Sequence, residues 1–209
     1  MARVGVLLCG CGFYDGTDLD EAVLTLLALD RAKVRAECIA PGLLTSETID
    51  HSTGTLVEGA DRSVLAESAR IARGRIVPIQ EARPGLLSAL VIPGGSGVVR
   101  TLMRGTTERG SKREADPEAA GLIKAMLARK KPVGAISLAG SLVATAMGLP
   151  LVEDPFSTPA SAIVVDEDRK IVWTPGHLSS DSLAEIGIGI ERMVAEVLKR
   201  TAHELPVLR

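Results

Sequence analysis

The stretch KKPVGAISLAG (130–140) decides the fold class, because it runs a short apolar segment directly into a helix at Ser137. Its residues 131–136 predict a strand, and a helix is expected from Ser137 to about Met147. The stretch ALVIPGGSG (89–97) repeats this arrangement, with an apolar strand over 86–92 that ends in glycines before another helix. Strands that alternate with helices in this way are typical of a parallel α/β sheet.

The rest of the chain continues the alternation. Further strands are expected over 3–9, 33–40 and 75–79, and AIVV and KIVW on either side of 166–169 predict a hairpin. Further helices are expected over 17–31, 63–73, 97–104, 117–130 and 179–200. Residues 43–62 are expected to form a loop with a small hairpin, and 104–118 a charged surface loop or a lid over the site. We therefore predict one α/β domain over 1–209, with helices on both faces of a mainly parallel sheet.

Composition excludes several classes of protein. The chain has 209 residues, of which 46% are hydrophobic, so it can form a sizeable core. A net charge of −2 and only four aromatic residues (two Phe, one Tyr, one Trp) argue against a nucleic-acid partner. The uncharged stretch 132–152 is interrupted by prolines and glycines, so no membrane association is expected. Three cysteines form no disulfide framework and no signal peptide is evident, which together predict a cytoplasmic protein.

Ser137 is the first candidate site residue. It lies between a buried strand and a helix, with Ala135 and Ala139 two positions away on either side. A nucleophile elbow needs small residues at these positions, because the sharp turn brings the flanking backbone close. A serine at this position is also a common helix N-cap. Both interpretations, a cap and a catalytic or ligand-contacting residue, are open from the spacing alone.

Two further segments are expected at the same sheet edge, since ligands bind at the carboxyl ends of parallel strands. The glycines of PGGSG (93–97) let backbone N–H groups converge on an oxyanion or carboxylate, or else simply make a tight turn. Glu21 is either part of a helix capping box or an acid/base carboxylate that points across the strand ends.

The cysteines and histidines add weaker candidates. Cys9 is expected in the core, whereas Cys11 lies in the loop at the presumed site. His177 follows the last strand, which makes it the one histidine considered as a general base. No metal site is expected, because the chain lacks ligands at finger-like spacing. No cofactor is expected either, because the glycines of PGGSG match neither a Walker sequence nor G-x-G-x-x-G.

Several segments taken together are similar to those of one known family. The residues 10–29, 61–74, 89–97, 130–140 and 163–175 resemble, in order along the chain, the ElbB-like proteins, named for enhancing lycopene (isoprenoid) biosynthesis, within the ThiJ/PfpI, class I glutamine-amidotransferase-like superfamily. The resemblance implies a flavodoxin-like three-layer sandwich and a homodimer. It places Glu21 on the family's glutamate and Gly94 and Gly95 on an oxyanion hole. Leu138, Cys11 and His177 are expected beside them as oxyanion- or substrate-binding residues, although the resemblance implies a different residue at the position of His177.

Two departures from the family pattern affect the chemistry. Ser137 stands where the family usually has a reactive cysteine, and a serine hydroxyl is much less acidic than a thiol and needs a positioned base. The segment 141–162 is also shorter than the resemblance implies.

Three functions therefore stay open. The first is a small-molecule site for a carbonyl or carboxylate, with weak cofactor-independent glyoxalase-like activity on 2-oxoaldehydes. The second is a non-catalytic protein that binds a metabolite or a partner. The third is a serine hydrolase that uses Ser137 and His177, for which the sequence offers no evident orienting acid.

Overall fold

The core of the fold is a seven-stranded sheet with the strand order β10-β11-β9-β6-β1-β2-β5. The computed structural model describes residues 2–45, 47–104, 113–150 and 156–201. The strands are β1 (Arg3–Leu7), β2 (Arg35–Ala40), β5 (Ile76–Pro78), β6 (Ala89–Ile92), β9 (Val133–Ile136), β10 (Val164–Asp166) and β11 (Ile171–Thr174). All neighbouring strands pair in parallel except β10, which runs antiparallel to β11. The strands β6 and β9, near the middle of the sheet, are entirely buried runs, as is typical of parallel strands that are covered on both faces.

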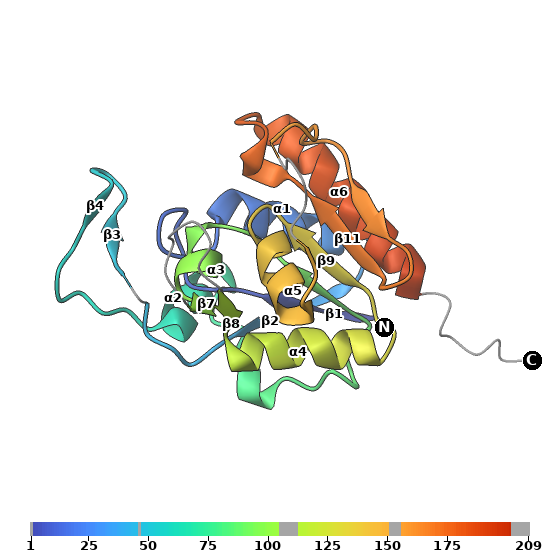
Figure 1. The fold of residues 1–209 in the computed structure, drawn as a ribbon, viewed down its shortest axis with the longest axis horizontal. Coiled ribbons are helices and arrows are strands. Elements are labelled where there is room, and N and C mark those ends of the chain that lie inside the picture. Colours follow the sequence, from blue (N-terminus) through green and yellow to red (C-terminus); the bar gives the residue numbers. More distant parts are fainter. Residues whose placement is uncertain (1, 46, 105–112, 151–155, 202–209) are drawn as a thin grey trace, which may run out of the picture.

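Helices cover both faces of this sheet (Figure 1). One apolar cluster joins the sheet to α1 (Leu19–Arg31), α2 (Val64–Ile71) and α6 (Leu183–Thr201). The other joins it to α3 (Ser96–Arg100), α4 (Pro117–Ala128) and α5 (Ala139–Met147). Two short 3-10 helices follow strands, η1 (Ile79–Glu81) after β5 and η2 (Gly176–Leu178) after β11. The expected flavodoxin-like α/β sandwich is confirmed, and so is the hairpin β10–β11 at its edge.

Two small hairpins lie outside the main sheet. The strands β3 (Ile49–Asp50) and β4 (Thr55–Leu56) form the hairpin expected within 43–62, and it projects from the body as an arm (Figure 1). The strands β7 (Met103–Arg104) and β8 (Glu114–Ala115) pair with each other. The helix expected over 97–104 is therefore wrong in its second half, because Met103 and Arg104 bond to a later strand.

The expected charged loop over 104–118 is only partly described. Its ends form β7, β8 and the start of α4, where the Asp116 side chain caps the helix. Residues 105–112, on which the hypothesis of a lid depends, lie outside the described residues, as do 151–155 of the short segment 141–162. Among the helices that the structure describes, none combines the length and apolar character needed to cross a membrane.

Candidate functional site

Four loops meet at the carboxyl ends of the central strands. The loop after β1 bonds to the loop after β6, since Asp18 N–H donates to Gly94 O at 2.9 Å and Gly97 N–H donates to Gly16 O at 3.0 Å. The turn after β9 is tied to the end of β11 by a 2.9 Å bond from Ser137 N–H to Thr174 O. The sheet thus brings together the segments that the sequence placed at one edge.

Ser137 occupies a sharp turn and is not the cap of α5. Its φ of 54° lies in the left-handed region, which is costly for any residue except glycine. The N-cap position of α5 is Leu138, and no side chain caps this helix. The helix-cap alternative for Ser137 is therefore wrong, and the backbone has the strained form expected of a nucleophile elbow.

The space around Ser137 is tight on all sides. Ala135 and Ala139, at the two flanking positions, are both fully buried, as an elbow requires. Ser137 is 6% exposed, and its hydroxyl makes no hydrogen bond to any residue that the structure describes. Its carbonyl accepts a bond of 3.0 Å from the indole N–H of Trp173, the single tryptophan of the chain. The hydroxyl is therefore free to contact a ligand, but no base is positioned to deprotonate it.

Glu21 reaches the same place from α1. Asp18 caps this helix by accepting from Glu21 N–H at 3.1 Å. The Glu21 side chain points into the protein instead of back to Asp18: Oε2 accepts from Gly94 N–H at 2.7 Å and Oε1 accepts from His177 N–H at 3.1 Å. The capping-box alternative is therefore wrong, and the carboxyl group bridges the loops after β6 and β11.

Complete burial changes the acidity of Glu21. The side chain has no solvent exposure, and burial together with the nearby charge of Asp18 raises its pKa to about 8. The N–H groups of His177 and Gly94 oppose this rise, because they stabilise the ionised form. Glu21 is therefore mainly protonated at neutral pH and can donate a proton as well as accept one.

Ser137 and Glu21 both pack against Gly94, which has room for them because it lacks a side chain. A Cβ at this position would lie 2.7 Å from Glu21 Oε2 and 2.8 Å from Ser137 Cβ. Any side chain other than hydrogen would therefore collide with both groups at once. The predicted juxtaposition of the elbow residue with the carboxyl group from the first helix is present.

The backbone amides of this region divide into occupied and free ones. The Gly94 N–H is already bonded to Glu21, so it is not available to a ligand. The N–H groups of Gly95 and Leu138, at the starts of α3 and α5, donate no hydrogen bond to any described residue. The amides of Gly95 and Leu138 are therefore the candidates for binding an oxyanion, whereas that of Gly94 is not.

His177 contributes its backbone to the site and turns its ring elsewhere. Its Nε2 lies 3.9 Å from Asp18 Oδ1 and 3.6 Å from Asp20 Oδ2, and this buried atom has no hydrogen-bond partner among the described residues. No hydrogen bond joins the ring to Ser137 within the part of the chain that is described, so the expected base is not in contact with the expected nucleophile. The ligand atoms of Asp18, Asp20 and His177 lie within 4.8 Å of one another, so these three side chains could together hold a metal ion.

The cysteines beside the site are poorly reactive. Cys9 is buried as expected, its thiol bonds to Gly97 O at 3.1 Å, and burial raises its pKa. Cys11 lies partly exposed in the loop after β1, where burial and the charge of Glu67 raise its pKa as well. A raised pKa disfavours the nucleophilic thiolate, so neither cysteine substitutes for one at position 137.

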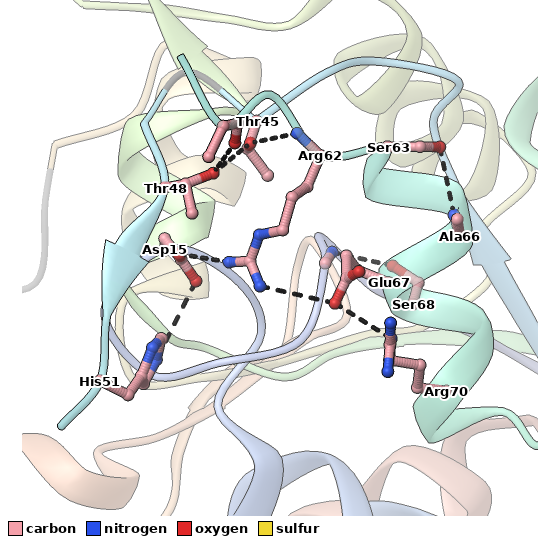
Figure 2. A network of polar contacts seen from close by, with 12 residues as sticks. Asp15, Thr45, Thr48, His51, Arg62, Ser63, Ala66, Glu67, Ser68 and Arg70 are labelled. Carbon is pink, nitrogen blue, oxygen red and sulfur yellow. Dashed lines mark hydrogen bonds and ion pairs between the residues drawn. The ribbon is translucent and has the colours of Figure 1, made fainter. Parts of the chain in front are cut away.

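A polar network that sequence reasoning missed holds the loop after β1 in place (Figure 2). The buried carboxylate of Asp15 accepts from Arg62 and, at 2.7 Å, from Ile49 N–H, and it lies 4.0 Å from His51 Nε2. Arg62 in turn contacts Glu67 at 3.6 Å. The network therefore links the loop to the arm and to α2. No sequence signal pointed to it, because Asp15 and Arg62 are 47 residues apart.

Curated relatives match almost the whole chain. The chain is 32% identical over 225 residues to the mitochondrial ES1 protein homolog of Rattus norvegicus and, equally, to the mitochondrial glutamine amidotransferase-like class 1 domain-containing protein 3 of Homo sapiens. Each match covers 96% of this chain and 84% of the relative. No protein-family model matches the chain.

Solved structures give the same result. The isoprenoid biosynthesis protein with an amidotransferase-like domain from Ehrlichia chaffeensis superposes with a TM-score of 0.86 and 30% identity, covering 94% of this chain and 99% of that one. Toxoplasma gondii DJ-1 superposes with a TM-score of 0.52 at 15% identity, covering 97% of this chain and 95% of that one, which shows a shared fold. The chain therefore belongs to the ElbB-like family of class I glutamine-amidotransferase-like proteins.

Proposed function

We propose that Ser137, Glu21 and the amides of Gly95 and Leu138, which we call the Ser137 site, together bind a small carbonyl or carboxylate compound. The observation that carries this proposal is that Ser137 and Glu21 both lie against Gly94, with the Ser137 hydroxyl and two N–H groups free of partners among the described residues. These groups are hydrogen-bond donors that suit an anionic or partly negative oxygen. Protonated Glu21 adds a further donor below its pKa of about 8.

Trp173 allows this binding to be measured directly. Its indole N–H is bonded to the Ser137 carbonyl, so its fluorescence reports on ligand binding at the elbow. We expect pyruvate, a 2-oxo acid with both functional groups, to change this fluorescence saturably. Its affinity should fall as the pH rises through about 8, because ionised Glu21 repels the ligand carboxylate.

The matched variants are Glu21→Gln and Arg83→Gln. The first removes the titrating group, so binding should become independent of pH in this range. The second changes an exposed arginine that is not part of the proposed site and should leave the wild-type profile intact. A fluorescence response that does not saturate, or one that stays independent of pH in the wild type, would refute the proposal.

A second candidate function is a slow, cofactor-independent conversion of 2-oxoaldehydes, and the raised pKa of Glu21 favours it. In this reaction Ser137 Oγ adds to the aldehyde carbon of methylglyoxal, and the hydroxyl proton passes to the aldehyde oxygen. Ionised Glu21 then takes the proton from C1 and returns it to C2, while the proton on the C1 oxygen moves to the C2 oxygen. This leaves a lactoyl ester on Ser137, and water releases lactate. A carboxyl group with a pKa of about 8 can take up and return that proton near neutral pH.

The identity of residue 137 separates binding from turnover. We expect Ser137→Cys to form lactate from methylglyoxal faster than the wild type, since a thiol ionises far more readily than a hydroxyl. Wild-type activity equal to that of Ser137→Ala would restrict the natural protein to binding. The serine-hydrolase alternative requires covalent labelling of Ser137 by a fluorophosphonate, and the position of the His177 ring against Asp18 and Asp20 gives it no support.

We also propose that the chain forms a homodimer through α1 and α6. Leu19, Val23 and Leu27 repeat every four residues along α1 and are 49%, 51% and 41% exposed. Ile188 of the adjacent α6 is 44% exposed. An apolar stripe of this kind is typical of a surface that another protein covers. Sedimentation of the wild type as a dimer and of Val23→Glu as a monomer would support this interface; a monomeric wild type would exclude it.

For localisation we propose the cytoplasm. All three cysteines are free, as a reducing compartment allows. The names of the rat and human relatives assign those proteins to mitochondria. Fractionation of the source cells with compartment markers tests the proposal, and recovery of the chain in an organelle would contradict it.

A further inference from the structure

A cavity of about 820 Å³ lies at the end of the sheet opposite Ser137. It is bordered by the first residues of β2, by the segment that leads into β5, and by the second half of α1. Because Ser137 follows the carboxyl end of β9, the cavity and the elbow are at opposite ends of the parallel strands. Its volume is within the range of about 300–1,000 Å³ that is usual for small-molecule sites.

The floor of this cavity is apolar. Ala36 and Cys38 of β2 and Ile76 of β5 line it, and Leu26 of α1 and Val34 border them. These five residues belong to, or pack against, the apolar cluster between the sheet and α1. Burial raises the pKa of Cys38 to about 11, so this thiol is a neutral part of the floor at physiological pH. The floor can therefore accept an apolar chain without leaving a charge buried beneath it.

The lining of the same cavity carries an excess of positive charge. Arg35, Arg73 and Arg75 line it, and none of the three has an ion pair or a side-chain hydrogen bond with any residue that the structure describes. Of the two acids in the lining, Glu37 is neutralised by Arg3 at 2.8 Å, which leaves Asp30. Guanidinium groups without partners beside an apolar floor are suited to a phosphate or carboxylate, which they can bind through paired hydrogen bonds.

We propose that this cavity, which we call the arginine groove, binds a small amphipathic anion: a phosphate or carboxylate head bound by Arg73 and Arg75, with an apolar chain along Ala36, Cys38 and Ile76. The lining of the groove includes none of the residues of the Ser137 site, so this proposal does not rest on the function proposed for that site.

Decyl phosphate, used below its micellar concentration, is the probe for this groove, and titration calorimetry on the full chain measures its affinity. We expect saturable binding that weakens about tenfold in the double variant Arg73→Gln/Arg75→Gln, because the anionic head then loses its charge-assisted hydrogen bonds at an exposed rim where solvent screens them. Arg83→Gln, which removes an exposed arginine outside the groove, should bind as the wild type does. Ala36→Phe fills the floor and should weaken binding without any change of charge.

Three further binding measurements identify the ligand class. Decyl glucoside has the chain without the anion, and inorganic phosphate has the anion without the chain, so both should bind at least about tenfold more weakly than decyl phosphate, because each lacks one of the two recognised groups. Vesicles of phosphatidylglycerol present the anion only at a membrane surface and should not sediment the protein.

Several results would overturn the proposal. If the double arginine variant and Arg83→Gln bind decyl phosphate with equal affinity, the arginines do not bind the head group. Equal affinity of the wild type for decyl glucoside and decyl phosphate would show the same. Sedimentation with vesicles, without binding of monomeric decyl phosphate, would assign the surface to a membrane. Loss of decyl phosphate binding in Glu21→Gln, with wild-type binding in the arginine variant, would place the anion at the other end of the sheet.

Discussion

The two ends of the parallel sheet differ in how their polar groups are held. At the carboxyl end, Glu21 is fully buried, both of its oxygens accept backbone N–H groups, and the loops around it are bonded to one another. At the amino end, Arg73 and Arg75 border an open groove and have no partners among the described residues. The same strands run from one end to the other, so the difference in how the polar groups are held comes from the loops that connect them.

This difference shows how one fold can separate chemistry from recognition. A fixed and desolvated carboxyl group has a shifted pKa and a defined geometry, which proton transfer requires. The long side chains of Arg73 and Arg75 at the open rim can adapt to ligands of different shape, but they do not hold a ligand atom in the fixed position that a reaction requires. The following predictions test whether the carboxyl end is as rigid, and the amino end as permissive, as this comparison states.

The largest effect is expected for Gly95→Ala. A Cβ there would lie 2.3 Å from Asp18 N and 2.4 Å from Gly16 O, both backbone atoms, and the φ of 104° is strained for alanine. We expect a loss of about 4 kcal/mol or more in the free energy of unfolding. Gly74→Ala is the matched control at the amino end, because its φ of 79° is also positive but no atom lies within 4 Å of its Cβ. It should cost only about 1 kcal/mol in urea denaturation; similar losses in the two variants would refute the difference in rigidity.

The next effect concerns the pH dependence of stability. The folded state raises the pKa of Glu21 from 4.5 to about 8, so between these values it binds a proton that the unfolded chain has released. The contribution of this group to stability should therefore be greatest below about pH 4.5 and should decline by roughly 4 kcal/mol as the pH rises to 8. Glu21→Gln should lack this decline. Parallel stability profiles of wild type and variant over pH 5–8 would show that the carboxyl group is not held as described.

The network in Figure 2 should have an intermediate effect. Asp15→Asn removes the charge that binds Arg62 and weakens the bond from Ile49 N–H, so we expect a loss of about 2 kcal/mol. Arg70 is the control, because its side chain is 71% exposed and its 3.2 Å contact with Glu67 is on the surface. Arg70→Gln should change the free energy of unfolding by less than about 0.5 kcal/mol. Equal small effects in urea denaturation would mean that the network does not hold the loop.

The smallest effects are expected for glycine substitutions at two residues with strained backbones, one at each end of the sheet. Ser137 and Arg73 have almost the same left-handed φ, 54° and 53°. Replacing either with glycine should alter stability by less than about 1 kcal/mol, since the relief of strain is offset by the greater freedom of the unfolded chain. Thermal unfolding measures both variants. A loss above about 2 kcal/mol in Ser137→Gly alone would mean that the side chain of Ser137 has a packing role in the fold, beyond its place at the elbow.

Much of the fold could be predicted from local sequence. Apolar runs that end in glycine or serine before a helical pattern, as in 86–97 and 131–140, correctly predicted the two central strands. The pair β7–β8 was missed because two-residue strands leave no periodic signal, and the expected helix over 97–104 was extended into one of them.

The sequence could predict which residues form the site, but not the hydrogen bonds between them. The sequence placed Ser137, Glu21 and the glycines at one edge because parallel strands share a carboxyl end. It could not show that Gly94 gives its N–H to Glu21, or that His177 contributes its backbone and not its ring, since hydrogen bonds over 73 and 156 residues depend on tertiary packing. The network of Asp15 was invisible for the same reason.

The most direct test of the central claim is the titration of Glu21 itself, followed by the ¹³C chemical shift of its side-chain carboxyl carbon in wild type, with Glu21→Gln to assign the signal. The account predicts a midpoint near pH 8, and a higher midpoint in Ser137→Cys, where a thiolate across Gly94 would further disfavour the ionised carboxylate. A midpoint near the ordinary value of 4.5, unchanged by the substitution at position 137, would show that the two side chains do not share a desolvated site.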